Sequence, residues 1–279
     1  MKKRNSMPLV SVIIPTRNSQ RTISQCLKSI ENQTYKKTET IVIDRYSTDE
    51  TVQTALQFKA KVFTLNCERS AAKNLGVKKA NGEFVFFLDS DMELNPKTVE
   101  ECVSLCQDGR FDAIAIPEVT VADGFLGKCR RLERDLYNYD PNSSLMPRFF
   151  RKETFLSISG FDEKLVCGED FDLARRYENQ GYQVGVAKVQ IKHLEGRVSL
   201  RKVVLKAYYY GRNLVPFFSR KPALALREYC PTRFVFNIKR LLQKPKFMVG
   251  LATLKLFEYI AYSIGILSDM LIKALPIRE

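Results

Sequence analysis

Two carboxylates, Asp89 and Asp91, follow directly after the apolar run of residues 84–88. Five apolar residues in a row indicate a strand that is buried on both faces of a sheet. In an open α/β sheet, ligands bind beyond the carboxyl ends of such strands. Two acidic side chains there can share a hard divalent cation, which in turn can hold a diphosphate. Taken alone, the pair favours a simpler interpretation, an acidic turn that caps the next helix.

The elements that must position these side chains alternate along the first part of the chain. Such alternation predicts an α/β fold with a mostly parallel sheet and right-handed crossovers. The predicted strands cover residues 9–14, 40–43, 62–65, 84–88 and 113–116, and the predicted helices cover 19–33, 48–58, 70–80 and a segment opening at Asn95-Pro96. Further on, we expect a polar helix (124–140), a loop (141–147), an irregular segment (154–168), a helix (169–179) and a strand (182–191) leading to His193.

Polar side chains also follow the other predicted strands. Thr16 and Arg17 come after the first strand, Asp44 ends the second, and Lys73 lies in the helix after the third. Each of these residues alone is weak evidence for a binding site, since Asp44 is compatible with a helix cap and Lys73 with a solvated helix face. Because parallel strands end at one edge of a sheet, we expect these residues to converge with Asp89 on one crevice.

The charge of the chain is distributed unevenly. The whole sequence carries a formal net charge of +14. Residues 196–279 contain 16 Lys or Arg against 4 Asp or Glu, a net +12, so residues 1–195 retain only +2. A strongly basic region indicates an anionic partner surface, either a membrane or a nucleic acid. No nucleic-acid recognition motif supports the second, so we predict no nucleic-acid partner.

The seven cysteines indicate reduced thiols. Their number is odd, none forms a Cys-x-x-Cys pair, and several fall in predicted helices or strands. This usage is typical of a cytosolic protein. The sequence does not predict a zinc site, because His193 is the sole histidine and no cysteine spacing fits. Residues 1–10 lack an apolar stretch of the length that a signal peptide requires.

The C-terminal region has helical patterns over residues 200–218 and 247–275. The second is apolar, but Lys255, Glu258 and Asp269 interrupt it, and no window of 18 residues is free of charge. A membrane span needs about 20 predominantly apolar residues. A helix lying in the headgroup region, with its apolar side down and basic residues beside it, fits better. The alternative is a pair of helices that packs on the main domain. We therefore predict two parts, residues 1–195 and a basic helical appendage at 196–279.

Six segments of the chain resemble the motifs of a known family, glycosyltransferase family 2, and they occur in the same order. They are residues 10–18 (VSVIIPTRN), 41–51 (IVIDRYSTDET), 71–76 (AAKNLG), 87–91 (FLDSD), 159–163 (SGFDE) and 168–173 (GEDFDL). The match covers roughly residues 8–195. The resemblance implies a GT-A (Rossmann-like) fold, a nucleotide-diphosphate sugar donor such as a UDP- or GDP-sugar, Mg²⁺ or Mn²⁺ as cofactor, and inversion at the anomeric carbon.

The resemblance also implies roles on the donor side. Asp44 would contact the nucleotide base, with Thr16 beside it and Arg17 and Lys73 as further donor-binding residues. Asp89 would face the ribose or the sugar, and Asp91 would bind the metal. Lys73 stands where the family usually has arginine. An arginine can make a bidentate contact, whereas a lysine offers only a point charge.

On the acceptor side, Asp170 would be the general base and Glu169 would help to hold the acceptor. A carboxylate that takes the proton of the attacking hydroxyl typically contributes ~10²–10⁴-fold. An acidic cap at a helix N-terminus is the alternative for both residues. His193 is equally compatible with a structural role and with a place near the metal beside Asp91 and Asp89. Ser159 departs from the family pattern, which has glycine there.

These observations favour an inverting glycosyltransferase that acts on a hydroxyl of a glycan or lipid-linked glycan, peripherally at the cytosolic face of an anionic membrane. A polyprenyl-phosphate sugar synthase is the first alternative. Its phosphate acceptor is already ionised and needs no base, so the Glu169-Asp170 pair argues for a hydroxyl acceptor. A non-catalytic nucleotide-sugar-binding protein is the second alternative.

Overall fold

The computed structural model of the chain describes residues 7–139, 146–229 and 232–274. The chain forms two compact units. The first contains Met1–Glu118, Leu145–Glu163 and Leu173–Leu194, and the second contains Val119–Ser144, Lys164–Asp172 and Glu195–Glu279. One unit boundary falls next to residue 195, where the sequence predicts a division, and two earlier segments also belong to the second unit.

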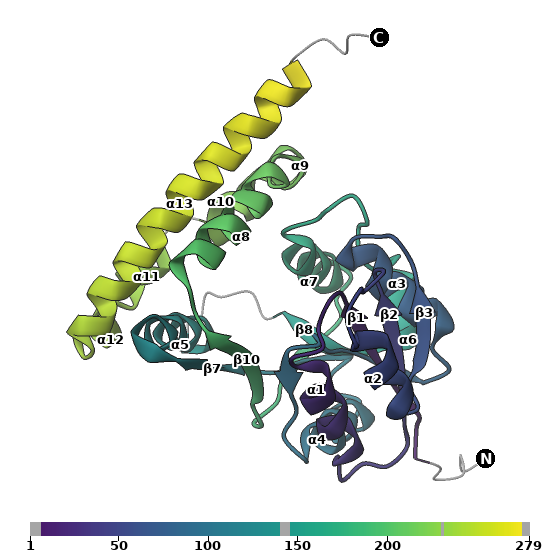
Figure 1. Cartoon of the computed structure of the whole chain (residues 1–279). Helices are drawn as coiled ribbons and strands as arrows, with labels where there is room; N and C mark the ends of the chain where they lie inside the picture. Colours follow the sequence, from purple (N-terminus) through teal and green to yellow (C-terminus); the bar gives the residue numbers. More distant parts are fainter. Residues whose placement is uncertain (1–6, 140–145, 230–231, 275–279) are drawn as a thin grey trace. The chain divides into compact units, whose positions relative to one another are not determined.

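The first unit is built on a seven-stranded, mostly parallel sheet, as predicted (Figure 1). Its order is β3-β2-β1-β4-β8-β6-β9, in which β3, β2, β1 and β4 run parallel and β8 runs antiparallel to β4 and β6. The strands are β1 (Val10–Thr16), β2 (Thr38–Asp44), β3 (Lys61–Thr64), β4 (Phe84–Phe87), β6 (Ala113–Ala115), β8 (Pro147–Arg151) and β9 (Val184–Val186).

Helices cover both faces of this sheet because its central strands carry apolar side chains in both directions. Val12 and Ile14 of β1 belong to one core cluster, with residues of α1 (Ile23–Glu31), α2 (Thr51–Gln57) and α4 (Thr98–Gln107). Ile13 belongs to the other cluster, with residues of α3 (Arg69–Lys79), α6 (Lys152–Ser157) and α7 (Glu169–Asn179). The six described cysteines are free thiols, as predicted, and five are buried.

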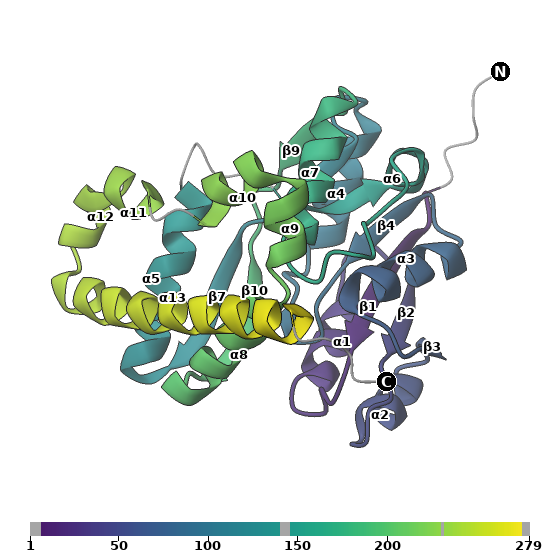
Figure 2. The same ribbon diagram turned by 90° about the horizontal axis from the view of Figure 1, so that it is seen from above.

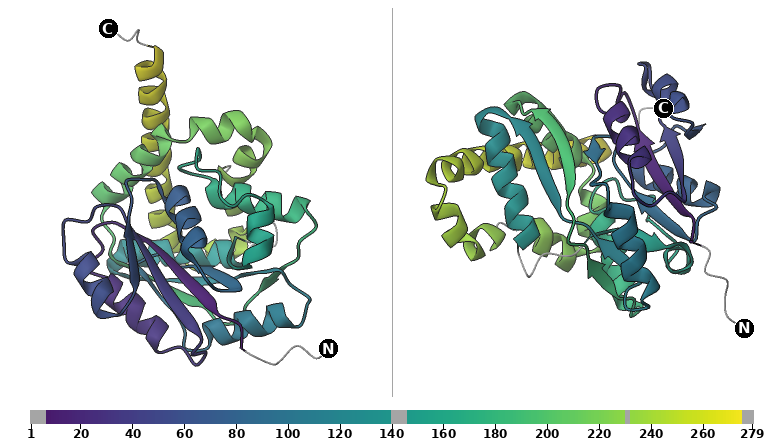
Figure 3. Two further views of the ribbon diagram at one scale, coloured as in Figure 1. Left: turned by 90° about the vertical axis from the view of Figure 1, so that its right-hand side faces the viewer. Right: turned by 90° about the horizontal axis from the view of Figure 1, so that it is seen from below.

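A second sheet has three strands in the order β5-β10-β7. Figure 3 (right) shows the teal strand β7 beside the green strand β10. Its strands are β5 (Met92–Glu93), β7 (Glu118–Asp123) and β10 (Ile191–Arg197). Within the first unit, β5 and β10 pair antiparallel, with His193 opposite Met92. The Leu194 N–H also donates to the Asp91 carbonyl at 2.7 Å. This pairing places His193 inside a strand, whereas the sequence predicts it beyond a strand end.

The second unit is mainly helical (Figure 2) and also contains most of β7 and the end of β10. Its helices are α5 (Gly124–Tyr139), the start of α7, α8 (Leu200–Arg212), α9 (Val215–Arg220), α10 (Pro222–Tyr229), α11 (Thr232–Phe236), α12 (Ile238–Leu242) and α13 (Pro245–Ala274). The long α13 packs along α8 and α5. Glycines permit this packing, because a Cβ on Gly211 would lie 2.4 Å from the Tyr262 carbonyl oxygen and one on Gly265 would lie 2.5 Å from that of Tyr208.

Several predicted elements differ from those observed. The strand expected over 182–191 is two strands, because the N–H groups of Lys188 and Val189 donate to the Glu101 carboxylate (2.6 and 3.2 Å) and not to a neighbouring strand. The helix expected over 200–218 is interrupted after Arg212, where Pro216 lacks a donor for a continuous helix. The helix expected from residue 19 begins at Ile23, and the segment 154–168, expected to be irregular, begins within α6. The loop expected over 141–147 falls mostly outside the described residues.

Candidate active site

The ends of β1 and β2 lie side by side at one edge of the sheet in the first unit. Thr16 and Asp44 are in register, and the Arg45 N–H donates to the Thr16 carbonyl at 2.9 Å. The buried Asp44 carboxylate accepts the N–H of Ser47 at 2.8 Å and its hydroxyl at 2.5 Å. The Thr16 hydroxyl is buried without a hydrogen-bond partner among the described residues, so a ligand at this edge can satisfy it.

The two loops that follow these strands are held in uncommon backbone conformations. Asn18 and Tyr46 have φ of +49° and +48°, which side chains other than glycine adopt rarely. Asn18 N–H donates to the Ser47 hydroxyl at 2.8 Å, and its side-chain oxygen accepts the Thr48 N–H at 2.9 Å. These hydrogen bonds join the two loops and maintain their strained backbone conformations. Backbone strain of this kind is typical of functional sites. Arg17 is exposed next to them.

Lys73 is placed by the close contact of α3 with the sheet. A Cβ on Gly76 would lie 2.3 Å from an Ile13 methyl carbon, so the glycine lets the helix approach β1. Lys73 is 2% exposed, and its Nζ lies 4.5 Å from the centre of the Phe161 ring. Its positive charge also acts on Asp89. The structure therefore buries Lys73 where its charge acts on Asp89, and not on a solvated face.

The next residue of α3 fixes the loop 159–163. The Asn74 amide accepts the Phe161 N–H at 3.0 Å and donates to the Phe161 carbonyl at 2.9 Å and to Glu163 Oε1 at 2.9 Å. Ser159 has a φ of +65°, in the left-handed region that favours glycine. Glycine adopts this conformation without strain, whereas serine does so at a cost in backbone energy.

Asp89 is held by an arginine that the sequence analysis did not identify. Arg148 of β8 donates from Nη1 to Asp89 Oδ2 at 3.2 Å, and from Nε and Nη2 to Glu118 Oε1 at 3.0 and 2.6 Å. Burial raises the pKa of Asp89, but Arg148, followed by Lys73 and Arg69, lowers it to a net value well below the ordinary one. Asp89 is therefore an ionised carboxylate with one oxygen committed to Arg148.

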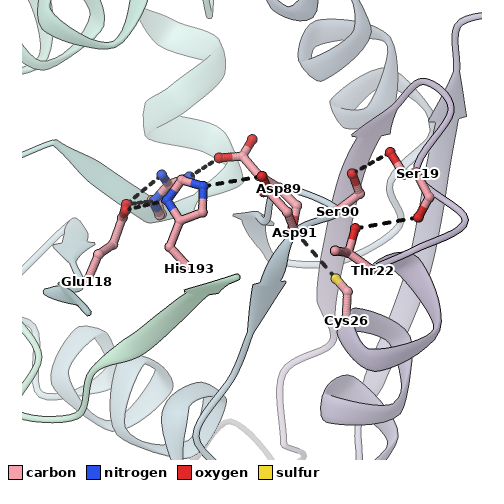
Figure 4. A network of polar contacts seen from close by, with 9 residues as sticks. Ser19, Thr22, Cys26, Asp89, Ser90, Asp91, Glu118 and His193 are labelled. Atoms are coloured by element: carbon pink, nitrogen blue, oxygen red, sulfur yellow. Dashed lines mark hydrogen bonds and ion pairs between the residues drawn. The ribbon is translucent and has the colours of Figure 1, made fainter. Parts of the chain in front are cut away.

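Asp91 faces His193 (Figure 4). His193 Nε2 lies 3.2 Å from Asp91 Oδ2, and His193 Nδ1 lies 3.4 Å from Glu118 Oε2. Burial lowers the pKa of His193, but its hydrogen bonds to Asp91 and Glu118 raise it to about 9. The side chain of Asp91 is 42% exposed, against 17% for His193 and 11% for Glu118. Asp91 is thus the open carboxylate of the network.

The turn between the two aspartates is anchored to the α1 region (Figure 4). The Ser90 hydroxyl donates to the Ser19 hydroxyl at 2.8 Å, and the Cys26 thiol contacts the Asp89 carbonyl at 3.6 Å. Since α1 packs in the core, these contacts fix the direction in which Asp89 and Asp91 project.

The side chains present fit a metal ion that is bound partly by the protein and partly by the diphosphate of a substrate. No cluster of three or more His, Cys, Asp or Glu arranged for a metal occurs in the part of the chain that the structure describes. Mg²⁺ is usually bound by one or two carboxylates together with substrate phosphates and waters. Asp91, with His193 once the ring gives up its extra proton, would supply such a partial set, whereas Asp89 faces Arg148. The metal-binding role of these three residues stays a prediction.

Glu169 and Asp170 begin α7 in the second unit. Gly168, with a φ of +78°, makes the turn before them, and a Cβ there would lie 2.6 Å from the Phe217 ring. Glu169 is 5% exposed and Asp170 is half-buried. Their acidic side chains occupy the first turn, where the helix dipole favours negative charge. Their action on the acceptor stays a prediction.

The structure joins Asp89, Asp91 and His193 into one network and adds Arg148 and Glu118, which the sequence analysis missed. Glu118 comes two residues after a predicted strand, so the criterion of polar residues at strand ends would have found it. Arg148 stands in a short strand bounded by a proline and carries no comparable signal.

Comparisons with known proteins identify the family and the fold. The profile described as Glycosyl transferase family 2 matches residues 11–161, more than half of the chain. A GalNAc(5)-diNAcBac-PP-undecaprenol beta-1,3-glucosyltransferase of Campylobacter jejuni is 42% identical over 230 residues, covering 71% of this chain and 74% of that protein. Glycosyltransferase AglE of Haloferax volcanii is 26% identical over 261 residues, covering 78% of this chain and 84% of AglE.

Two solved structures show the same fold. The mannosyltransferase PcManGT from Pyrobaculum calidifontis, in complex with GDP-Man and Mn²⁺, aligns with a TM-score of 0.63 at 20% identity over 95% of this chain and 88% of its own. Staphylococcus aureus TarS 1–349, in complex with UDP-GlcNAc, aligns with a TM-score of 0.57 at 20% identity over 94% and 89%. The protein is a glycosyltransferase with the GT-A fold. It belongs to glycosyltransferase family 2.

Proposed function

We propose that the protein is a metal-dependent, inverting glycosyltransferase that moves a sugar from a UDP- or GDP-sugar to a hydroxyl of a lipid-linked glycan. The observation that carries this proposal is the network at the end of β4, where the open carboxylate of Asp91 faces His193 while Arg148 orients Asp89. A family 2 transferase needs such a site to receive a sugar diphosphate.

The donor would lie along the carboxyl edge of the first unit. Asp44 and Thr16 are buried at the ends of β2 and β1, where they can hydrogen-bond the nucleotide base. Lys73 would add a positive charge toward the diphosphate, and Asp89 would accept hydrogen bonds from the ribose or the sugar. Arg17, exposed on the same loop as Thr16, would contact the donor at the rim.

Asp91, with His193 beside it, would hold Mg²⁺ or Mn²⁺ on the diphosphate. When bound, the ion neutralises the charge that develops on the leaving diphosphate. The remaining residues orient this pair, because Glu118 contacts the second nitrogen of His193 and fixes the ring.

Asp170 would take the proton of the acceptor hydroxyl. In the reaction, the hydroxyl oxygen forms a bond to the anomeric carbon, the bond from that carbon to the diphosphate oxygen breaks, and the nucleoside diphosphate leaves from the opposite face. The proton passes to the Asp170 carboxylate. Glu169 would help to hold the acceptor. Both residues begin α7 after the Gly168 turn.

The acceptor class is supported by the Campylobacter jejuni relative, whose name specifies an undecaprenol diphosphate-linked glycan. A lipid-linked acceptor requires the enzyme to work at a membrane. The basic residues 196–279 and the free thiols support a peripheral position at the cytosolic face.

The test is a nucleotide-release assay over UDP-, GDP- and TDP-sugars, each with Mn²⁺, Mg²⁺ or a chelator. We expect one donor to be hydrolysed slowly with metal and not with the chelator. Binding of a nucleotide sugar without release under any condition, even with lipid-linked acceptors, would instead indicate a non-catalytic binding protein.

The Asp170→Asn variant separates the hydroxyl acceptor from a phosphate acceptor. A hydroxyl must lose its proton during attack, so the variant should lower transfer by about 10²-fold or more. A polyprenyl phosphate is already ionised and needs no base. A mild effect of Asp170→Asn, with transfer to polyprenyl phosphate, would therefore favour a polyprenyl-phosphate sugar synthase.

A further inference from the structure

The outward face of α13 is a mostly apolar stripe, which the exposed Thr253 interrupts. Its large residues are 48% to 66% exposed and recur every three to seven positions, so that they lie on one side of the helix. We define the outer stripe as Val249, Leu256, Ile260, Ile264, Leu267 and Leu271. Between residues 249 and 271 the helix has only three charged residues, Lys255, Glu258 and Asp269, and helical spacing places all of them on the other side.

The opposite face of α13 is locked within the second unit. Lys255 Nζ lies 2.8 Å from Glu258 Oε2 and also contacts Glu133 of α5, and Arg130 of α5 contacts both glutamates. A Cβ on Gly250 would lie 2.6 Å from the Cys129 sulfur of α5. With the glycine contacts to α8 described above, α5 and α8 cover this face over most of its length.

By length and composition, α13 is the one helix of the described ranges that qualifies as a membrane span. Its neighbours argue against spanning. If α13 crossed a bilayer, the Arg130 and Glu133 side chains of α5 would enter the hydrocarbon with it, and so would α8, which carries Lys202 and Lys206. Charged side chains inside the hydrocarbon are costly. While these contacts remain, α13 can meet lipid with its exposed side, which carries the outer stripe.

The charge around the stripe indicates the kind of surface that covers it. No acidic residue occurs between Glu228 and Glu258. The segment before α13 and the first turn of α13 expose apolar side chains (Val235, Phe236, Ile238, Leu242) and basic residues (Lys239, Arg240, Lys244, Lys246). An anionic lipid surface matches both sets. A second copy of the chain, also at +14, would be repelled.

We propose that α13 lies flat in the interface of an anionic membrane, with the outer stripe in the lipid and its axis parallel to the bilayer plane. This inference rests on the proposed membrane location and specifies the surface and its orientation. Such helices bury their apolar side about 5–10 Å into the headgroup and acyl boundary. The helix would thereby hold the second unit, which includes Glu169 and Asp170, at the surface where a lipid-linked acceptor resides.

The first experiment measures how deeply α13 lies in the bilayer. The chain contains no tryptophan, so one introduced residue reports its own position. Leu256→Trp, Ile264→Trp and Leu271→Trp would each be bound to phosphatidylglycerol vesicles and quenched by lipids brominated at known depths. We expect the same shallow depth for all three. A span would spread the three positions over about 22 Å of the bilayer normal, at ~1.5 Å per residue. They would then report different depths, with at least one near the bilayer centre, and this result would overturn the proposal.

The second experiment removes the stripe. The triple variant Ile260→Ser, Ile264→Ser, Leu267→Ser should bind these vesicles at least about 100-fold more weakly, because three large aliphatic side chains no longer enter the lipid. The matched control is Leu56→Ser with Leu156→Ser, two exposed leucines of the first unit, which should bind as the unaltered chain does. Equal binding by the triple variant would refute the proposal.

Two further readouts separate this proposal from others. The triple variant should keep metal-dependent donor hydrolysis, so a failure of docking differs from a failure of the proposed transfer reaction. Sedimentation equilibrium without lipid should show a monomer for the unaltered chain. A dimer that the triple variant abolishes would instead assign the outer stripe to a second copy.

Discussion

His193 Nδ1 lies 3.4 Å from Glu118 Oε2, while Nε2 of the same ring lies 3.2 Å from Asp91 Oδ2. The imidazole is therefore held between two carboxylates, of which Glu118 is the more buried. A second carboxylate on the far nitrogen of a metal-binding histidine fixes the ring orientation and increases its basicity. The pairing of β10 with β5 supports the same geometry from the backbone.

Glu118→Gln should weaken metal use without abolishing it. The amide retains the size of the side chain but removes the charge that faces His193. Loss of such a partner typically lowers metal affinity by about 10–100-fold. We expect the Mn²⁺ concentration for half-maximal donor hydrolysis to rise by this factor, with little change at saturating metal. Glu93→Gln, on the adjacent strand and paired with Lys192, is the control and should leave the metal dependence unchanged.

Arg148→Gln should shift the acid limb of the pH profile upward. Burial raises the pKa of Asp89, and Arg148 is the largest influence that lowers it. Without the guanidinium, the pKa of Asp89 rises, so the carboxylate is protonated at higher pH and donor turnover falls earlier on acidification. The measurement is kcat/KM for donor hydrolysis between about pH 4 and 8. Arg151→Gln on the same strand is the control, and an identical shift there would contradict this assignment.

The sequence predicts the parallel half of the sheet well. Strands β1, β2 and β4 follow from apolar runs, because strands buried on both faces need apolar side chains in both directions. Since parallel strands end at one edge, the positions of Thr16 and Asp44 also follow, and the register of β1 with β2 places these two residues opposite each other.

The antiparallel additions could not be predicted in the same way. Strand β5 has two residues and β8 begins at a proline, so neither carries a local pattern. Their formation depends on pairing with β10, β4 and β6, which are distant in sequence. Arg148 therefore remained unidentified until the sheet was assembled.

Gly168→Ala should impair the protein more than Gly181→Ala. Both glycines have positive φ, +78° and +81°, so alanine costs about 1–2 kcal/mol of backbone strain at either. Only at Gly168 would the new Cβ also meet a side chain, the Phe217 ring, whereas nothing lies within 4 Å at Gly181. We expect a larger loss of unfolding free energy at Gly168, together with reduced sugar transfer. Equal losses in denaturant unfolding would show that the Phe217 contact is unimportant.

The buried ion cluster between α5 and α13 makes a pH-dependent contribution to stability. Burial raises the pKa of Glu133, but Lys255 and then Arg130 lower it below the ordinary value of 4.5. A group whose pKa is depressed on folding stabilises the folded state above its unfolded pKa. That contribution is lost as the pH falls from about 4.5 toward the depressed value.

Glu133→Gln should therefore cost about 3–5 kcal/mol at neutral pH, because it leaves buried cations without one partner. The variant should also lose less stability than the unaltered chain between neutral pH and about pH 3, since it no longer takes up that proton. Urea unfolding at both pH values measures each difference. The control is Glu178→Gln, which breaks the exposed pair Arg175–Glu178 at the same i,i+3 spacing as Arg130–Glu133. An exposed pair is worth about 0–1 kcal/mol, so a Glu133→Gln effect no larger than that of the control would show that the cluster does not hold α13 to α5.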